Sequence, residues 1–249
     1  MLHLKFIKKI FCFRNPFEEG KAIENLQTKI VAIDGPAGAG KSTVSKILAR
    51  RLGYVFLDTG AMYRAVAVEA ERQGIQPDDE PALEKLCQNL SISFQPEGEE
   101  QKVFCQGMDV TEKIREPHIG MLASRVSMKK PVREAMVRLQ RQAGSQGKIV
   151  AEGRDTTTVV FPDARFKFFL VAEPEERARR RYRELVSKGV KARIEDIQEE
   201  INKRDEQDSS RDLAPLRAPE EAFFIDSTES TPEEVVEEMI KVIRRKSRK

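Results

Sequence analysis

The sequence predicts an α/β protein with a central five-stranded parallel sheet and helices on both of its faces. From residue 29 onward, short apolar runs alternate with segments of helical periodicity. The apolar runs are continuous rather than alternating, as in strands that are buried on both faces. Strands that alternate with helices favour a parallel sheet, because each helix carries the chain back to the same end of the sheet.

Each element is expected from its own local pattern. The five apolar runs that predict strands are Lys29–Asp34, Tyr54–Leu57, Lys148–Ala151, Phe166–Val171 and Phe223–Asp226. Helical patterns follow the first two runs, to Leu52 and to about Gly74, and return at Pro174–Lys188, Ile194–Asp208 and Pro232–Arg245. Gly53 suits the end of the first helix, since glycine readily adopts the left-handed conformation found there.

The region 76–116 differs from the rest of the chain. It contains three prolines and short alternating runs at Ser91–Phe94 and Lys102–Cys105. This pattern of prolines and short alternating runs predicts a small α+β insert within a single domain at 29–246. Residues 1–28 mix apolar residues with lysine and arginine and lack the apolar stretch and cleavage site of a signal peptide. We expect a poorly ordered leader there, with a surface-binding amphipathic helix as the alternative.

Composition narrows the possible functions. The 44 Lys and Arg against 41 Asp and Glu leave a net charge of +3, which does not call for a nucleic-acid or membrane partner. The three cysteines lack metal or redox spacing, and two histidines leave little for histidine-based chemistry. No apolar run approaches the roughly 18–20 residues that span a bilayer. These observations favour a cytoplasmic protein, which we expect to be a monomer.

Residues 35–42, GPAGAGKS, fit the pattern G-x-x-x-x-G-K-[ST] and lie between a predicted strand and a predicted helix. Backbone N–H groups of such a loop and of the following helix bind phosphate oxygens. Lys41 can reach the β- and γ-phosphates, and the Ser42 hydroxyl can ligate Mg²⁺. The sequence therefore predicts an ATP site made of Gly35, Pro36, Ala37, Gly38, Ala39, Gly40, Lys41, Ser42 and Thr43.

Charged residues interrupt a helical face where a structural helix would stay apolar. A seam of isoleucines that starts at Ile194 continues in register into Arg204, Asp208 and Arg211. Buried charges are unfavourable unless they are paired or bound to a ligand. This pattern indicates a ligand site, or else a helix end that emerges into solvent with Arg204 paired to Asp208.

Two further basic clusters precede or begin helices. Lys129, Lys130 and Arg133 crowd a helix start at Pro131, where the helix dipole disfavours cations, so either an anionic ligand or solvation is expected. Arg177, Arg180 and Arg181 share the face of another helix. There, Glu175 and Glu176 can pair with Arg179 and Arg180, which leaves Arg177 and Arg181 without an evident local partner. Positioned guanidinium groups stabilise phosphoryl transfer.

Taken together, several strings resemble bacterial cytidylate kinase, in the nucleoside monophosphate kinase group of P-loop proteins. They are IDGPAGAGKST, LDTGAMYRA, ASRVSMKKPVREAMVRLQR, AEGRD with TVVFPDA, EERARRRYREL and KRDEQDSSRDLAPL, spread over about 29–246. The resemblance implies a P-loop kinase fold with an arginine-rich lid at about 174–193. It also implies transfer of the γ-phosphate of ATP to CMP or dCMP, with Mg²⁺.

The resemblance assigns roles to individual residues. The phosphate of CMP would be held by Thr59, Arg64, Arg154 and Arg211. The base would be read by Ser124, Arg133 and Asp155, and the ribose would be held by Arg204 and Asp208. The catalytic residues would be Lys41 and Arg154, with Arg177, Arg180 and Arg181 clamping the transferred phosphoryl group. Independently of the resemblance, the phosphate-loop motif gives Ser42 as the metal ligand, and Glu152, at the end of the predicted strand Lys148–Ala151, could assist it through a water.

Thr156 and Thr157 depart from the family pattern, which has an apolar residue and then glycine after GRD. Threonine avoids positive φ, so this loop is expected to use ordinary backbone angles or to differ locally. The departure leaves open a broader UMP/CMP kinase. A P-loop ATPase that binds nucleic acid through its arginines is the alternative of a different class, although the scarcity of aromatic residues disfavours it.

Overall fold

The computed structural model describes residues 30–247 apart from 99, 146 and 188. The chain forms two compact units, of which the larger comprises 30–58 and 141–247 and the smaller 59–140. The leader predicted at 1–28 lies outside the described residues. The domain boundaries at 29–246 and the limits of the lid stay predictions.

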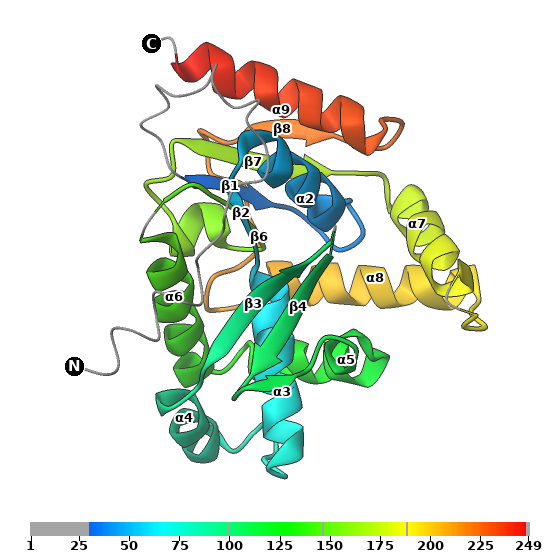
Figure 1. The fold of residues 1–249 in the computed structure, drawn as a ribbon. Helices are drawn as coiled ribbons and strands as arrows, with labels where there is room; N and C mark the ends of the chain where they lie inside the picture. Colours follow the sequence, from blue (N-terminus) through cyan, green and yellow to red (C-terminus); the bar gives the residue numbers. More distant parts are fainter. Residues whose placement is uncertain (1–29, 99, 146, 188, 248–249) are drawn as a thin grey trace. The chain divides into compact units, whose positions relative to one another are not determined.

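The larger unit is built on a five-stranded sheet, which confirms the predicted architecture (Figure 1). Its order is β2 (Val55–Asp58), β6 (Ile149–Gly153), β1 (Ile30–Asp34), β7 (Phe166–Val171) and β8 (Phe223–Asp226), and all neighbouring strands are parallel. Ligands of such sheets bind beyond the carboxyl ends of the strands. Here Asp34 lies opposite Gly153, and Asp58 opposite Glu152, at that edge.

Strand β6 continues past the end of the predicted run at Ala151. Glu152 and Gly153 are buried and extend the ladder with β1, and Glu152 also pairs with β2. A carboxylate does not fit the apolar pattern of a buried strand, so the apolar run ends two residues before the strand does. The presence of the Glu152 carboxylate at the carboxyl edge of the sheet indicates a functional site rather than a core position.

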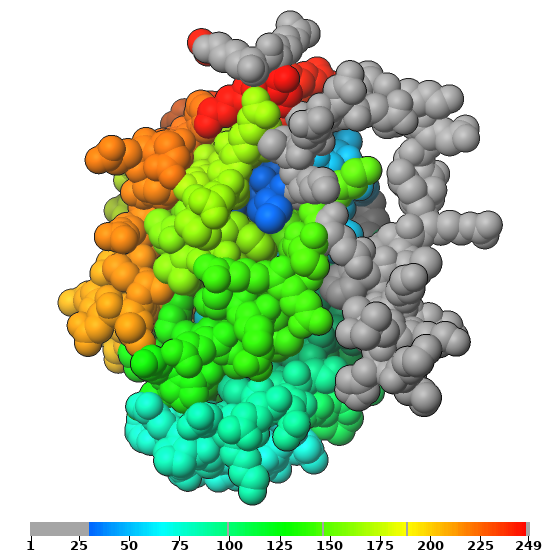
Figure 2. All heavy atoms as spheres, turned by 90° about the vertical axis from the view of Figure 1, so that its left-hand side faces the viewer, coloured from blue at the N-terminus to red at the C-terminus, as the bar shows by residue number. Residues whose placement is uncertain are grey.

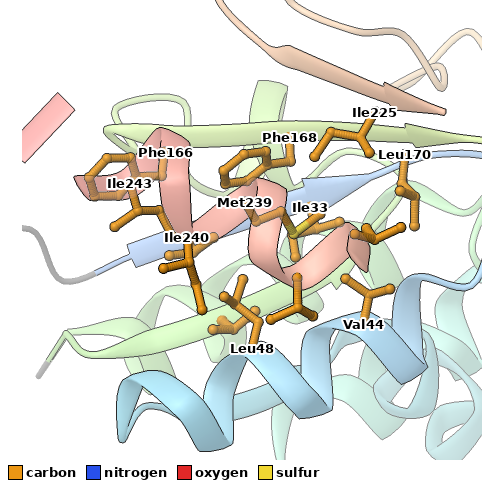
Figure 3. Packing of buried hydrophobic residues seen from close by; sticks show 14 of the residues in the cluster. Ile33, Val44, Leu48, Phe166, Phe168, Leu170, Ile225, Met239, Ile240 and Ile243 are labelled. Atoms are coloured by element: carbon orange, nitrogen blue, oxygen red, sulfur yellow. The ribbon is translucent and has the colours of Figure 1, made fainter. Parts of the chain in front are cut away.

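Two helices, α2 (Lys41–Leu52) and α9 (Pro232–Ser247), pack with the sheet around the main core (Figure 3). Val44 and Leu48 of α2 meet Met239 and Ile240 of α9, next to aromatic side chains of β7 such as Phe168. Each such buried side chain contributes about 1.5–3 kcal/mol through loss of water contact. This core holds the end of β1 and the start of α2 in place.

The start of β7 also joins the end of α9, which Figure 2 shows as lime atoms beside red ones. The Arg165 guanidinium donates to the backbone carbonyl of Lys246. The Lys246 ammonium lies 4.5 Å from the centroid of the Phe223 ring on β8. These contacts tie the C-terminal helix to the two last strands of the sheet.

A separate small core joins α7 (Pro174–Ser187) to α8 (Ile194–Ser209). Ala178 packs against Ile197 and Ile201, so the predicted seam of α8 is buried from Ile197 onward. Ile194 does not belong to it: it is 37% exposed, because it is the first residue of the helix.

The smaller unit contains α3 (Thr59–Arg72), α4 (Glu80–Gln88), α5 (Pro117–Val126), the first part of α6 (Lys130–Gly144) and the short 3₁₀ helix η2 (Lys113–Arg115). It also contains an antiparallel sheet of β3 (Ile92–Glu97), β4 (Glu100–Cys105) and β5 (Met108–Asp109). This sheet and α4 lie within 76–116, the region predicted as a small α+β insert. None of the helices in the described part of the chain has the length and apolar character needed to cross a bilayer.

Candidate active site

The loop between β1 and α2 has the backbone shape that the sequence predicts for phosphate binding. Gly35 has φ +150°, and a Cβ on it would lie 2.0 Å from the carbonyl oxygen of Leu170 on the neighbouring strand, so only glycine fits. Gly40 adopts the left-handed conformation and precedes α2 without a side-chain cap. Ser42 and Thr43 follow in the first, exposed turn of the helix. The loop thus leaves the first N–H groups of α2 available to phosphate oxygens.

Lys41 is buried at the start of α2, and its Nζ donates to the carbonyl oxygen of Pro36 at 2.7 Å. Burial, together with the charge of Arg154, lowers the pKa of the Lys41 ammonium to about 7. A buried ammonium that is this poorly compensated favours an anionic ligand. The phosphates of a nucleotide are such a ligand.

Oxygen atoms that suit Mg²⁺ gather beside Lys41. Burial and the charge of Asp58 raise the pKa of Glu152 to about 7, while the Ser42 hydroxyl donates a hydrogen bond to Glu152. Magnesium is held by one or two carboxylates or hydroxyls together with substrate phosphates, rather than by a complete protein cage. Among the described residues, 30–247 apart from 99, 146 and 188, no group of three His, Cys, Asp or Glu side chains gathers in a way that could hold a metal ion.

The ionic end of α8 meets the segment that follows β6. The carboxylate of Asp208, which is 2% exposed, accepts from Arg154 Nε at 2.7 Å and also pairs with Arg211. Burial alone would raise the pKa of Asp208, but the charges of Arg154 and Arg211 outweigh it and hold this pKa below its ordinary value. Asp208 is therefore buried between two arginines and does not lie at a helix end that emerges into solvent.

These groups form one electrostatic cluster. The charges of Arg154 and Arg204 both lower the pKa of Lys41, and the charge of Arg204 also lowers that of Asp208. Together with Arg211, which pairs with Asp208, four cationic side chains therefore belong to one network. Such a concentration of guanidinium and ammonium groups suits phosphoryl groups.

The arginines of α7 bind partners that the sequence does not reveal. Arg177 is buried, donates to the carbonyl oxygens of Ala172 and Ala37 at 3.0 Å each, and pairs with Asp205 of α8. Asp205 in turn accepts from the Ala37 N–H at 3.1 Å. Both the carbonyl and the N–H of one phosphate-loop residue are therefore held by an ion pair between α7 and α8.

Arg180 and Arg181 differ from each other. Arg180 donates to Ser227 and Thr228, and its guanidinium lies 3.6 Å from the position of a Cβ on Gly40, next to the phosphate loop. Arg181 pairs with Glu184 at 2.7 Å, so the expectation that it has no local partner is wrong. Glu184 follows Arg181 by three residues, and side chains three residues apart on a helix are neighbours just as those four residues apart are.

Glu176 is the ion-pair partner of three arginines of α7. Its carboxylate lies 3.2 Å from Arg180, 3.7 Å from Arg179 and 3.4 Å from Arg183. The predicted Glu176–Arg180 pair is therefore present, whereas Arg179 pairs with Glu176 rather than with Glu175. The role of the three arginines as phosphoryl clamps stays a prediction.

Replacing Arg177 with alanine is expected to raise KM for ATP about tenfold, because the Ala37 carbonyl and Asp205 lose a charged donor. Steady-state kinetics with varied ATP at saturating acceptor would measure it. Arg179→Ala is the matched control, because Arg179 lies on the same helix with its side chain 58% exposed. Equal KM values for ATP in both variants would contradict a role of Arg177 in holding the loop.

The predicted acceptor residues Thr59, Arg64, Ser124 and Arg133 belong to the smaller unit. Thr59 is buried at the first position of α3, and Arg64 follows in the same helix. Arg133 is buried, donates to the carbonyl of Ser127 at 3.1 Å and lies 5.8 Å from the ring centroid of Tyr63. Their combination with Arg154, Asp155, Arg204, Asp208 and Arg211 of the larger unit into one acceptor site stays a prediction.

The two lysines at the start of α6 already have carboxylate partners. Lys129 lies 3.0 Å from Asp78 and 3.7 Å from Glu80, and Lys130 lies 3.9 Å from Glu134. The carboxylates beside Lys129 offset the unfavourable dipole without an anionic ligand, and Lys130 is 71% exposed, as the solvation alternative expects. Because Asp78 and Glu80 are distant in sequence, their contribution could not be read from the helix itself.

The threonines that depart from the family pattern form a single π-helical turn, η3 (Thr156–Val160). Positive φ occurs at Gln106, Lys148 and Ala214 among the described non-glycine residues, so Thr157 has the ordinary backbone angles predicted for it. Asp155 is buried directly before this turn. The threonines bind the carboxylate of Asp34, which sequence patterns mark only by its place before the phosphate loop.

Comparisons with known proteins identify the family of this chain. The family model described as cytidylate kinase matches residues 31–245. The chain is 51% identical to a cytidylate kinase of Citrifermentans bemidjiense over 215 residues, which cover 86% of this chain and 92% of that one. It is 50% identical to a cytidylate kinase of Geobacter sulfurreducens over 219 residues, covering 88% and 94%.

A solved structure of shikimate kinase from Bacteroides thetaiotaomicron gives a TM-score of 0.45 at 13% identity, covering 87% of this chain and 98% of that one. That likeness is too weak to carry an argument, and the fold assignment rests on the order of the sheet. The family, in contrast, is established by a match over nearly all of the described residues and by identities near one half. The chain belongs to the cytidylate kinase family.

Proposed function

We propose that this protein transfers the γ-phosphate of ATP to CMP or dCMP, giving ADP and CDP or dCDP. The observation that carries the proposal is the position of buried Lys41 beside the Arg154–Asp208–Arg211 network, at the carboxyl edge of the sheet. A group that binds donor phosphates and a group that suits acceptor phosphates thereby lie next to each other. The relatives, which are named cytidylate kinases, supply the identity of the acceptor.

On the donor side, the loop 35–43 binds the phosphates of ATP through backbone N–H groups and the first turn of α2. Lys41 neutralises charge on the β- and γ-phosphates. Ser42, with Glu152 and Asp58 nearby, would hold Mg²⁺, which supplies further charge neutralisation when bound. Arg177 and Asp205 fix Ala37, and with it the loop.

On the acceptor side, Arg154 and Arg211 bind the phosphate of CMP, together with Thr59 and Arg64 of the smaller unit. Arg204 and Asp208 hold the ribose. Ser124, Arg133 and Asp155 read the base, and the Asp155 carboxylate accepts from the N4 amino group, as carboxylates do when they read a cytosine edge. The reaction needs no side-chain nucleophile, because an oxygen of the CMP phosphate attacks the γ-phosphorus and catalysis comes from positioning and charge stabilisation.

In the proposed reaction, α7 is the lid. Arg180, already beside Gly40, and Arg181 stabilise the charge that spreads over the transferred phosphoryl group. Closure of the lid would exclude water and so suppress hydrolysis of ATP. We expect the enzyme to act as a monomer in the cytoplasm.

A coupled assay of ADP release with CMP, dCMP, UMP, AMP, GMP and shikimate as separate acceptors tests the proposal. CMP or dCMP is expected to give the highest kcat/KM. Equal use of UMP and CMP would favour the broader UMP/CMP kinase. Preference for AMP, GMP or shikimate would contradict the proposal, as would salt-dependent oligonucleotide binding without any acceptor phosphorylation.

ATP binding is expected to take up about one proton per ATP at about pH 8.5, where Lys41 is largely neutral in the free protein. Its free pKa of about 7 is lowered by burial and by Arg154, and the ATP phosphates would raise it by favouring the ammonium. ATP affinity should therefore fall as the pH rises above about 7, by up to about tenfold per unit. Isothermal titration calorimetry without Mg²⁺, in buffers of different ionisation enthalpy, measures this uptake.

Lys41→Met is the control, since it cannot take up this proton. At about pH 8.5 both Glu152 and the phosphates of free ATP are ionised, and any proton that they take up on binding would appear in both proteins and cancel in the comparison. Proton uptake of equal size in the unmodified protein and in Lys41→Met would show that another group titrates.

A further inference from the structure

The carboxylate of Asp34, at the end of β1, is fully buried and receives four hydrogen bonds from two consecutive residues. Its Oδ1 accepts from the N–H and the hydroxyl of Thr156, at 3.0 and 2.6 Å. Its Oδ2 accepts from the N–H and the hydroxyl of Thr157, at 2.7 and 2.6 Å. Each carboxylate oxygen thus has one backbone donor and one side-chain donor, in a region from which water is excluded.

The parallel pairing of β1 with β6 brings these groups together. Asp34 lies opposite Gly153, so the segment that leaves β6 passes directly by the Asp34 side chain. There the chain makes the turn η3, in which the carbonyl oxygen of Asp155 accepts from Val159 and Val160. The first N–H groups of a helical turn lack partners within the turn, and here Asp34 provides them.

The hydroxyls are not needed to satisfy Asp34, since two N–H groups already reach it. They add two charge-assisted bonds, and both threonines are completely buried, so their side chains have no freedom to move away. An apolar residue followed by glycine, the pattern from which this chain departs, would supply the N–H groups alone. The pair Thr156–Thr157 therefore makes the attachment of this turn to β1 more rigid.

The two segments that Asp34 joins belong to the donor part and the acceptor part of the proposed site. Arg154 and Asp155 immediately precede the threonines, and Arg154 reaches from there to Asp208. Gly35 and Pro36 immediately follow Asp34, and the Pro36 carbonyl accepts from Lys41. A single buried carboxylate thus connects the base of the phosphate loop with the segment that carries Arg154 and Asp155.

We propose that Thr156 and Thr157 are positioning residues for acceptor binding: through Asp34 they fix Arg154 and Asp155 relative to the phosphate loop. This inference rests on the proposed function, in which those two residues contact CMP. It assigns the threonines no contact with either nucleotide. Because the threonine hydroxyls act on the segment that carries Arg154 and Asp155, which we call the acceptor segment, their removal should change recognition of CMP more than that of ATP.

The test replaces each threonine singly by valine, which keeps the shape and the N–H but removes the hydroxyl. Thr156→Val and Thr157→Val are expected to raise KM for CMP about tenfold, with KM for ATP and kcat within about twofold of the unmodified protein. Thr156→Ser and Thr157→Ser, which restore the hydroxyl, should return KM for CMP close to its original value. If the valine variants do not fold, alanine at the same positions serves the same comparison.

Thr158→Val is the matched control. The hydroxyl of Thr158 is buried in the same turn and has no hydrogen-bond partner among the described residues, so its removal should leave KM for CMP unchanged. An equal rise of KM for CMP in Thr158→Val would overturn the proposal. A loss of kcat with unchanged KM values in Thr156→Val and Thr157→Val would also overturn it, because that result indicates a purely structural role.

A further variant separates this inference from the proposed function. Arg154→Ala should raise KM for CMP whether or not the threonines position it. If Arg154→Ala does so while the valine variants leave KM for CMP unchanged, the positioning role is wrong and the proposed function stands. If the unmodified protein does not phosphorylate CMP, both the function and the inference built on it are wrong.

Discussion

Replacing Lys41 with methionine is expected to lower kcat about 10²–10³-fold, as the loss of one positioned electrostatic group typically does. The ammonium is buried, is held by the Pro36 carbonyl and lies where the donor phosphates are proposed to bind. Methionine keeps the length and apolar stem of lysine, so the packing of α2 should persist. Turnover at saturating ATP and CMP measures the effect, and circular dichroism checks that the fold remains.

Lys241→Met on α9 provides the comparison, because Lys241 is an exposed lysine of the same unit. It should retain full kcat. A Lys41→Met enzyme with undiminished turnover would remove Lys41 from the catalytic groups and leave the phosphate loop as a binding element only.

Replacing Asp208 with asparagine is expected to lower the free energy of unfolding by about 3–5 kcal/mol, the typical effect of breaking a buried ion pair. The change removes the buried negative charge that lies between Arg154 and Arg211, and it leaves their guanidinium groups facing each other with Arg204 and Lys41 close by. Urea denaturation measures the loss. In a thermal scan it corresponds to a fall of roughly 2–4 °C for each kcal/mol at this chain length.

Asp212→Asn is the matched change, since Asp212 is exposed and lies just beyond Arg211 in the chain. Its effect should stay within about 0.5 kcal/mol, as for most surface substitutions. If binding of CMP restores much of the stability lost in Asp208→Asn, the phosphate has taken over part of the role of the carboxylate. Equal stability of the two variants would show that Asp208 does not offset the arginine charges.

The sheet could be predicted because its strands are short, mainly apolar runs. The inner strands β6, β1 and β7 are almost entirely buried, whereas the edge strand β8 leaves Phe224 61% exposed. Phe166–Val171 and Phe223–Asp226 match β7 and β8 residue for residue. The phosphate loop could be predicted because its function depends on local backbone geometry, which glycine and lysine at fixed spacing encode. The extension of β6 through Glu152 and Gly153 could not be predicted from the apolar pattern, because the buried carboxylate of Glu152 serves the site rather than the core.

The contacts within the candidate site were mostly beyond the reach of the sequence. In the sequence, Arg177 is one of several arginines on a predicted helix, and Asp205 has the pattern of a solvent-exposed charge. Their pairing across Ala37 requires α7 and α8 to lie side by side next to the phosphate loop, which is a property of the tertiary structure. The same holds for Asp34 and the threonines, which are far apart in sequence and meet only through the β1–β6 pairing.

The order of the sheet has a consequence for the precision of the proposed reaction. Strands β6, β1 and β7 are neighbours, and they lead respectively to the acceptor segment, the phosphate loop and the lid helix. The bases of these three segments are therefore spaced by the hydrogen-bond ladder, about 4.8 Å from one strand to the next, a distance that side-chain substitutions scarcely alter. Mutations in this enzyme can change how its loops bind nucleotides, but the starting points of the loops are set by backbone geometry common to parallel sheets.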